Sequence, residues 1–341
     1  MRPRPPSRAV TAALLASLVL LTLFAACGGG GGASHTDRLI IVRNEGLFEL
    51  SLADGSEQVL VANLPDSVLI EPALSPSRDR MAYVRQLTPI IIPGQPFELG
   101  MDLYLAGVGG SDPVMLLEHS QRNEAIRSPS WFPDGQRLLI NVQNLVGAQI
   151  VTTIETLDLQ TGTRTPVVGD GFLPSVSPDG AQIVFLRSGA QLNQSLWVAH
   201  ADGSGARLLA GPDDGLGSIS SPRFSPDGRL VAFGAAELQG GGSIRAPGPA
   251  GVALAGRAAN AAARDANGLP QDIWLYDLEA GELRLLAAVQ LDQPSIAWSG
   301  DGGTIFAFAG AGLFAIDPDG GSSRRLGEGT FHGQMDWVSA E

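Results

Sequence analysis

Residues 174–186 read PSVSPDGAQIVFL, and residues 222–234 read PRFSPDGRLVAFG. Each copy joins a short apolar stretch, a Ser-Pro-Asp-Gly sequence and a longer apolar run. Fainter versions occur at 72–84 (PALSPSRDRMAYV), 129–141 (PSWFPDGQRLLIN) and 294–308 (PSIAWSGDGGTIFAF). Internal repetition of this kind is typical of a fold assembled from several copies of one small unit.

The repeated sequence predicts a hairpin. In Ser225-Pro226-Asp227-Gly228, proline presets the φ angle at the second position of a type I turn, and glycine is favoured at the fourth. Such a turn, with its glycine in the left-handed region, reverses a strand and forms a bulge. The apolar run after each turn, such as residues 183–186 (IVFL), is short enough for a strand that is covered on both faces.

A second, weaker theme follows each turn sequence. It places an apolar strand, a glycine turn and a leucine-bearing strand at 195–210 (SLWVAHADGSGARLLA), 272–287 (DIWLYDLEAGELRLLA) and 312–327 (GLFAIDPDGGSSRRLG). Two hairpins in each unit give four strands, and repeats of this size with glycine punctuation are typical of propeller blades.

Five complete units can be counted, and they begin near Glu71, Ser128, Leu173, Ser221 and Gln293. Residues 38–62 supply the last three strands of a further unit, and residues 333–341 supply a first strand, with Trp337 in the place of Trp131 and Trp298. Because an open sheet edge leaves N–H and C=O groups unpaired, the two ends are expected to complete one shared blade. The predicted fold is all-β: a six-bladed β-propeller over residues 38–341.

These motifs, SPDG followed by an apolar strand and then a DG turn between two further strands, resemble the WD-like repeats of TolB-type propellers. The resemblance covers essentially all of residues 38–341, and two units match SPDG letter for letter. It implies the propeller fold. It implies no particular partner, because propellers host binding, scaffolding and catalysis alike.

The amino terminus predicts export. A basic region (MRPRPPSR) precedes an uncharged apolar run and small residues, so residues 1–26 are interpreted as a signal peptide. Cys27 after FAA resembles the lipid-attachment site of a bacterial lipoprotein, and residues 27–37 would then be a lipidated, glycine-rich tether. The alternative is an uncleaved membrane helix, since the apolar run approaches the roughly 20 residues that span a bilayer. Both interpretations predict an extracytoplasmic, membrane-anchored protein, in the periplasm or at the cell surface.

Composition excludes several classes of function. The net charge is −13 with no basic cluster to offset it, which disfavours nucleic-acid binding. All 22 basic residues are arginine, so lysine Schiff-base chemistry and a phosphate-loop lysine are absent from this sequence. Cys27 is the single cysteine, which leaves the exported domain without a disulfide.

No motif for catalysis, metal binding or a cofactor emerges, and none is predicted. The four histidines, His35, His119, His200 and His332, show no metal-ligand spacing. Residues 299–306 (SGDGGTIF) resemble the Asp-box turn of sialidase-type propellers, a structural turn that occurs once here. Acidic residues are numerous enough for a glycosidase pair in the central channel, but the sequence singles none out.

The candidate binding residues lie in loops between second and third strands. Long loops are predicted at 85–101 and 235–270, and the second is rich in alanine, glycine and proline. The first holds Ile90, Ile91, Ile92 and Phe97 between prolines, and a third, shorter loop at 144–149 holds Leu145 and Val146. Exposed apolar side chains of this kind favour a protein partner on the loop face, although the isoleucine loop folding back on the ring is an equal alternative.

The resulting hypothesis is a lipid-anchored propeller that binds or scaffolds proteins, without a cofactor. The alternatives are a carbohydrate- or peptide-active enzyme that uses the propeller channel, and a ligand-sensing subunit of a membrane complex. Three or more acids, arginines or histidines converging in the channel would favour chemistry.

Overall fold

The computed structural model describes residues 37–88, 100–119, 124–146, 149–189, 193–238, 269–309, 312–320, 322–327 and 332–338. These residues belong to one compact unit and are almost entirely strands, with one 3₁₀ turn at Pro212–Asp214. The strands are β1 (Arg38–Arg43), β2 (Gly46–Ser51), β3 (Glu57–Ala62), β4 (Ser67–Leu74), β5 (Arg80–Leu87), β6 (Met101–Gly107), β7 (Val114–Leu117), β8 (Glu124–Trp131), β9 (Arg137–Val146), β10 (Gln149–Asp158), β11 (Arg164–Gly169), β12 (Gly171–Val176), β13 (Gln182–Ser188), β14 (Gln194–His200), β15 (Arg207–Ala210), β16 (Leu216–Phe224), β17 (Leu230–Glu237), β18 (Gln271–Asp277), β19 (Glu282–Leu291), β20 (Ser295–Trp298), β21 (Ile305–Ala309), β22 (Gly312–Ile316), β23 (Ser323–Gly327) and β24 (His332–Val338).

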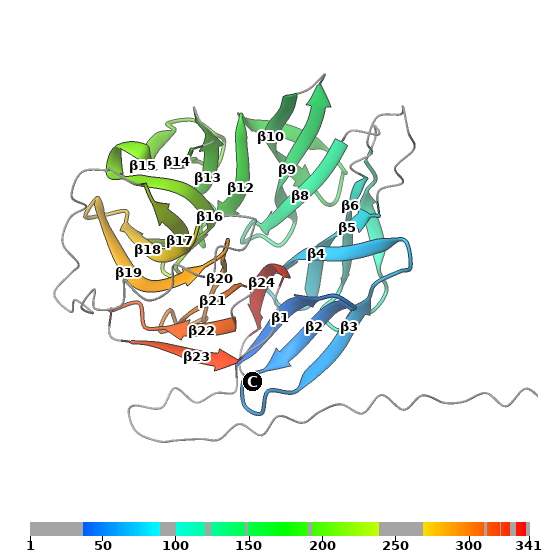
Figure 1. The fold of residues 1–341 in the computed structure, drawn as a ribbon. Coiled ribbons are helices and arrows are strands. Elements are labelled where there is room, and N and C mark those ends of the chain that lie inside the picture. The colour runs from blue at the N-terminus through cyan, green and yellow to red at the C-terminus, as the bar shows by residue number, and fades with distance from the viewer. Residues whose placement is uncertain are drawn as a thin grey trace, which may run out of the picture. The chain divides into compact units, whose positions relative to one another are not determined.

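The strands form antiparallel groups of four arranged in a ring. Four sheets have the orders β24-β1-β2-β3, β12-β13-β14-β15, β16-β17-β18-β19 and β20-β21-β22-β23. A larger sheet of eight strands consists of β4–β7 and β8–β11, joined by one parallel pair between Met101 and Ala125. The innermost strands contact one another in the order β4, β8, β12, β16, β20, β24 and back to β4 (Figure 1). The predicted propeller with its blades of four strands is confirmed.

The ring closes as the sequence predicts. Strand β24 pairs antiparallel with β1, with Leu39 opposite Trp337 and Ile40 opposite Asp336 (Figure 1). Two further bonds attach β24 to its neighbours: Leu74 donates its N–H to the Asp336 carboxylate at 2.7 Å, and the Met335 N–H bonds to the Ser295 hydroxyl at 2.9 Å. The first and last strands therefore complete one blade.

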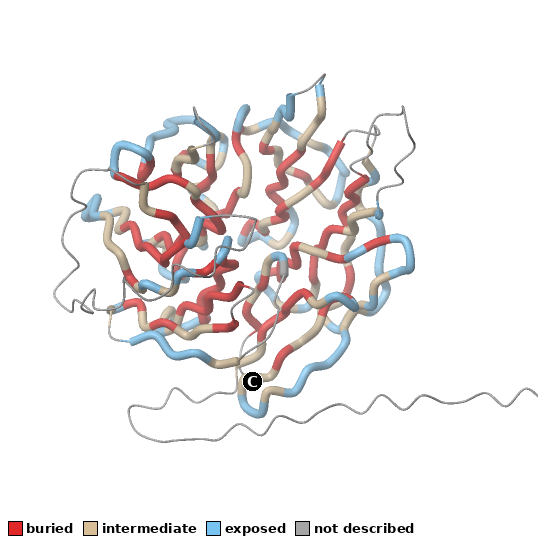
Figure 2. The backbone as a smooth tube through the Cα atoms, viewed as in Figure 1, coloured by how far each residue is buried: buried red, intermediate tan, exposed pale blue. Residues whose placement is uncertain are grey.

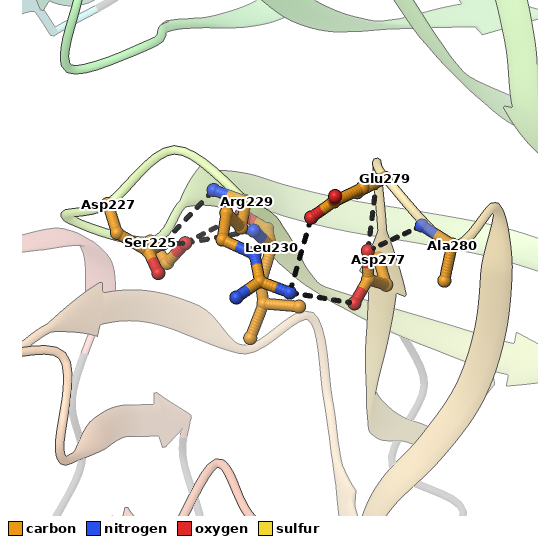
Figure 3. A network of polar contacts seen from close by, with 7 residues as sticks. All are labelled: Ser225, Asp227, Arg229, Leu230, Asp277, Glu279 and Ala280. Carbon is orange, nitrogen blue, oxygen red and sulfur yellow. Dashed lines mark hydrogen bonds and ion pairs between the residues drawn. The ribbon is translucent and has the colours of Figure 1, made fainter.

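Each Ser-Pro-Asp-Gly turn is held by its own side chains. In the β16–β17 turn, Ser225 Oγ donates to Asp227 at 2.6 Å and accepts the Leu230 N–H at 2.9 Å (Figure 3). Gly228 follows with φ of 75°, the left-handed conformation that glycine adopts without strain. Arg229 then reaches Glu279 and Asp277 on the β18–β19 turn (Figure 3). The predicted turn geometry is confirmed.

The innermost strands contain a feature that the repeats did not reveal. The five residues at which the units begin all have positive φ although none is glycine, and a proline follows each: Glu71, Ser128, Leu173, Ser221 and Gln293. Four of them lie within a shift in the pairing register of an innermost strand. Such β-bulges bend the strand and redirect its side chains.

The core lies between neighbouring blades, where apolar side chains of the two inner strand pairs interdigitate. Buried residues are concentrated near the centre of the ring, and exposed residues lie mainly toward its periphery (Figure 2). One cluster joins Phe233 and Trp274 to Val184 and Leu196 of the preceding blade. Among the described residues, no helix is long and apolar enough to cross a membrane.

The turn aspartates are expected to make the stability of the fold depend on pH. Hydrogen bonds from Ser177, Ser225 and Ser299 lower the pKa values of Asp179, Asp227 and Asp301. A carboxylate whose folded-state pKa is depressed contributes stability above its unfolded pKa of about 3.9, and loses it as the pH falls through the folded pKa. We therefore expect the melting temperature to fall steeply below about pH 4.

A serine-to-alanine variant tests whether these hydrogen bonds cause the expected dependence of stability on pH. Replacing Ser177, Ser225 and Ser299 by alanine should lower the melting temperature at pH 7 and flatten its dependence on pH between 5 and 2. Equal slopes for the variant and the wild type would show that the acid sensitivity arises elsewhere.

Candidate functional site

The β9–β10 hairpin projects beyond its neighbouring strands. Among the described residues, β8 pairs with β9 as far as Asn144, and β11 pairs with β10 from Thr153 onward. Between these limits the described part of the chain offers β9 and β10 no partner but each other, through Val146 opposite Gln149 and Ile150 opposite Leu145. We call Leu145, Val146, Gln149, Ile150 and Val151 the hairpin tip.

The hairpin tip is apolar on both of its faces. Val146 and Ile150 are each 62% exposed and Val151 is 43% exposed. Because successive residues of a strand point to opposite faces, Leu145 and Ile150 share one face while Val146 and Val151 share the other. No charged residue occurs from 138 to 154. An uncharged ribbon with two exposed apolar faces is unusual for a loop in water.

An apolar cavity opens on the same face of the ring. It has a volume of about 230 Å³ and is lined by Val42, Arg43, Asn44, Val68, Leu69 and Ile70. Like β9, β1 is the second strand of its blade, so the end of β1 and the hairpin tip lie on one side, which we call the loop face. The Ser-Pro-Asp-Gly turns lie on the opposite side, the turn face.

The structure tests only part of the predicted binding set. Leu145 and Val146 lie at the hairpin tip, part-buried and exposed respectively. Ile90, Ile91, Ile92, Phe97 and Cys27 lie outside the described residues, as does most of 235–270. Thr88, the last described residue before the isoleucine loop, lies on the loop face, where it donates its N–H to the Asp66 carbonyl at 2.7 Å.

Sequence reasoning missed Ile150, Val151 and the apolar cavity. The β-branched residues of 149–153 (QIVTT) indicate a strand but do not reveal that its neighbour β11 ends opposite Thr153. The cavity joins residues of β1 and β4, which belong to different blades.

Charged side chains also meet in the central channel. Arg223 on β16 donates to Gln334 on β24 at 2.9 Å, a bond that bypasses the intervening strand β20. Burial lowers the pKa of Arg223, and the charges of Asp336 and Glu71 oppose that shift. Arg127 on β8 pairs with Glu71 on β4 at 2.5 Å. Two arginines and two carboxylates thus converge from four innermost strands.

Both channel carboxylates are already occupied by hydrogen-bond donors. Glu71 accepts from Arg127 and from the Ser128 N–H at 2.6 Å. Asp336 accepts the N–H groups of Leu74 and Trp337 through separate oxygens. A general base needs an oxygen within reach of the substrate, whereas Glu71 bonds β8 through both oxygens and Asp336 bonds β4 through one of its own. The observed geometry is that of structural links between blades.

Two other buried carboxylates have a similar structural role. Asp102 and Asp272 are the second residues of β6 and β18, the third strands of their blades. They accept the N–H groups of His119 and Gln290, respectively, close to the outer strand. Burial raises the pKa of Asp272. Among the described residues, no three His, Cys, Asp or Glu side chains form a group that could hold a metal ion.

A second cavity, of about 610 Å³, is an open groove on the turn face, between β10–β11 and residues 201–202. Threonines and Asp158 dominate its lining, and Asp158 already accepts from Gln160 and Thr161. It offers hydroxyl groups but no reactive pair in the part of the chain that the structure describes.

Solved structures share this architecture at low sequence identity. TolB from Acinetobacter baumannii is 14% identical, with a TM-score of 0.63 over 90% of this chain and 68% of that chain. A chain of a nidogen/laminin complex is 12% identical, with a TM-score of 0.61 over 89% of this chain and 99% of its own. An oligogalacturonate lyase in complex with manganese is 14% identical, with a TM-score of 0.52 over 82% and 70%.

No protein-family model matches the chain. Identities this low establish a shared fold and leave function to be argued from the site. The chain is therefore similar in fold to TolB-type β-propellers.

Proposed function

We propose that this protein is an extracytoplasmic, lipid-anchored propeller that binds a protein partner through its loop face. The observation that carries the proposal is the hairpin tip, which exposes Val146, Ile150 and Val151 in a stretch without a charged residue from 138 to 154. The hydrophobic free energy gained on binding is greatest when a cleft of the partner covers both faces of such a ribbon. The apolar cavity at Val68 and Leu69 extends the same face.

The position of the tether supports this orientation. The chain enters the ring at Asp37, and β1 runs from the turn face to the loop face. With Cys27 as the lipid-attachment site, the ten residues up to Asp37 would span at most about 35 Å when extended. The turn face would then lie nearest the membrane, and the loop face would point toward soluble or membrane-bound partners.

Substitution at the hairpin tip tests the proposal. A variant with Val146, Ile150 and Val151 changed to serine should fold normally, because these side chains are exposed, and should lose partners that co-purify with the wild type after crosslinking in native membranes. The matched control is Val59→Ser, which removes an apolar side chain of 50% exposure from the outermost strand β3. Partners retained by the triple variant, or lost equally with Val59→Ser, would contradict the proposal.

The isoleucine loop is tested separately. Changing Ile90, Ile91 and Ile92 to serine should also release the partner if that loop contributes to the binding face. Release without a change in the melting temperature would favour partner contact over packing against the ring.

Chemistry in the channel is the second candidate, favoured by the convergence of Arg127, Arg223, Glu71 and Asp336 and by a fold shared with an oligogalacturonate lyase. Incubation with oligogalacturonate and Mn²⁺ should then produce unsaturated sugars that absorb in the ultraviolet, and Arg223→Ala should abolish the signal. We place this candidate second because both carboxylates are bonded to backbone N–H groups.

A further inference from the structure

The outermost strands of the blades are open sheet edges, and five of the six carry charged residues. These are Glu57 in β3, Arg164 in β11, Arg207 in β15, Glu282 and Arg284 in β19, and Arg324 and Arg325 in β23. Charged side chains and proline on an edge strand oppose pairing with another chain. Strand β7 (Val-Met-Leu-Leu) has neither a charge nor a proline.

Strand β7 also exposes apolar surface along its free edge. Among the described strands it pairs with β6 alone, through Leu105 opposite Val114 and Tyr104 opposite Met115. Val114 is 58% exposed and Met115 is 44% exposed, while Leu116 and Leu117 pack on the core between blades. The inner side of β7 is therefore fixed, and its outer side presents a row of backbone donors and acceptors beside apolar side chains.

The charges around β7 indicate what this edge accepts. Asp112 precedes the strand and Glu118 follows it, and both are exposed. A second copy of the chain, with net charge −13, would bring like charges together, and four residues of edge bury far less than the roughly 1,200 Å² of a stable dimer. An extended segment with apolar residues and a basic residue at each end matches both the strand and its flanks.

We propose that β7 accepts such a segment of a partner protein as an additional strand of its blade. Main-chain hydrogen bonds would supply most of the affinity, and Arg or Lys beside Asp112 and Glu118 would fix the position. The outer edge of β7 is formed by residues other than those of the hairpin tip, so this proposal can fail or succeed independently of the loop-face proposal.

A synthetic peptide probes the edge directly. Acetyl-Arg-Val-Thr-Val-Thr-Val-Arg-amide, labelled with a fluorophore, should bind the purified chain and slow hydrogen exchange of the amides at 114–117. Binding should weaken at least tenfold for an analogue N-methylated at alternate residues, because methylation removes the main-chain donors. It should also weaken severalfold when both arginines are replaced by glutamate.

The two four-residue outer strands provide a matched pair of variants. Met115→Lys places a charge on β7, whereas Leu208→Lys places one on β15, where Leu208 is 43% exposed and lies opposite Trp197 as Met115 lies opposite Tyr104. Peptide affinity should fall at least tenfold in Met115→Lys and stay unchanged in Leu208→Lys and in the hairpin-tip variant. If Met115→Lys fails to fold, Val114→Lys at the more exposed position replaces it.

Three outcomes would overturn the proposal. These are no binding at millimolar peptide, equal binding of the N-methylated analogue, and equal weakening by Met115→Lys and Leu208→Lys.

Discussion

Deleting residues 333–341 is expected to lower the melting temperature by more than 10 °C or to abolish cooperative unfolding. The deletion removes almost all of β24, and with it the buried side chains of Met335, Trp337 and Val338. Each large apolar side chain contributes about 1.5–3 kcal/mol by burial, and the cavity left behind adds to the loss. Since a whole domain is stable by only about 5–15 kcal/mol, this one strand represents a large share of the total.

The loss reaches beyond apolar burial, because β24 contacts both neighbouring innermost strands. Without it, β1 becomes an open edge, and the N–H of Leu74 loses its acceptor, Asp336. Thermal unfolding followed by circular dichroism measures the effect. Deletion of residues 339–341 alone is the matched control and should leave the melt unchanged. If the protein lacking residues 333–341 melted at the same temperature as the full-length protein, the stability of the ring would not depend on its closing strand.

The fold could be predicted from sequence because its decisive signals are local. A Ser-Pro-Asp-Gly turn contains the residues that hold it, as the bonds among Ser225, Asp227 and Leu230 show. The pairing of β24 with β1 could also be predicted, because the first unit has three strands and lacks its innermost one, and the end of the chain supplies a single innermost strand. Both signals can be recognised from the content of single repeat units, without knowing how the blades pack.

The features of the candidate site lie in contacts between blades, which single repeats do not specify. Glu71 contacts Arg127 and Ser128 of the next blade, which lie 56 and 57 residues further along the chain. The exposure of Ile150 depends on where β11 ends, and that of Met115 depends on the absence of a fifth strand beside β7 among the described residues. A sequence pattern predicts that these residues lie in strands; only the packed ring determines which of them face water.

Replacing Glu71 by alanine is expected to destabilise the protein by about 3 kcal/mol. Glu71 is buried at the centre of the ring, and the substitution leaves Arg127 without its ion-pair partner and the Ser128 N–H without an acceptor. Breaking a fully buried pair from one side costs about 3–5 kcal/mol, and the lower end applies because Arg127 keeps partial contact with water. The Nε of Arg127 is buried without a hydrogen-bond partner even in the wild type. Loss of Glu71 would therefore leave a second part of the same guanidinium without an acceptor.

Two further variants separate charge from hydrogen bonding. Glu71→Gln keeps an oxygen for the Ser128 N–H and should cost about half as much as alanine, since only the ion pair is weakened. Both variants retain a β-carbon at the positive φ of residue 71, so backbone strain is the same in each. The control is Glu279→Ala, which removes an exposed partner of Arg229 on the turn face and should change stability by less than about 1 kcal/mol.

Urea unfolding of the wild type and the three variants measures the free energy of unfolding of each protein. The comparison shows whether Glu71 stabilises the contact between blades or contributes nothing to stability. The order wild type and Glu279→Ala, then Glu71→Gln, then Glu71→Ala is the result that a structural Glu71 requires. If Glu71→Ala instead unfolded at the same urea concentration as Glu279→Ala, the carboxylate would contribute nothing to holding β4 against β8. The burial of Glu71 beside two arginines would then favour chemistry in the channel. A buried charged group that does not stabilise the fold is typical of functional sites.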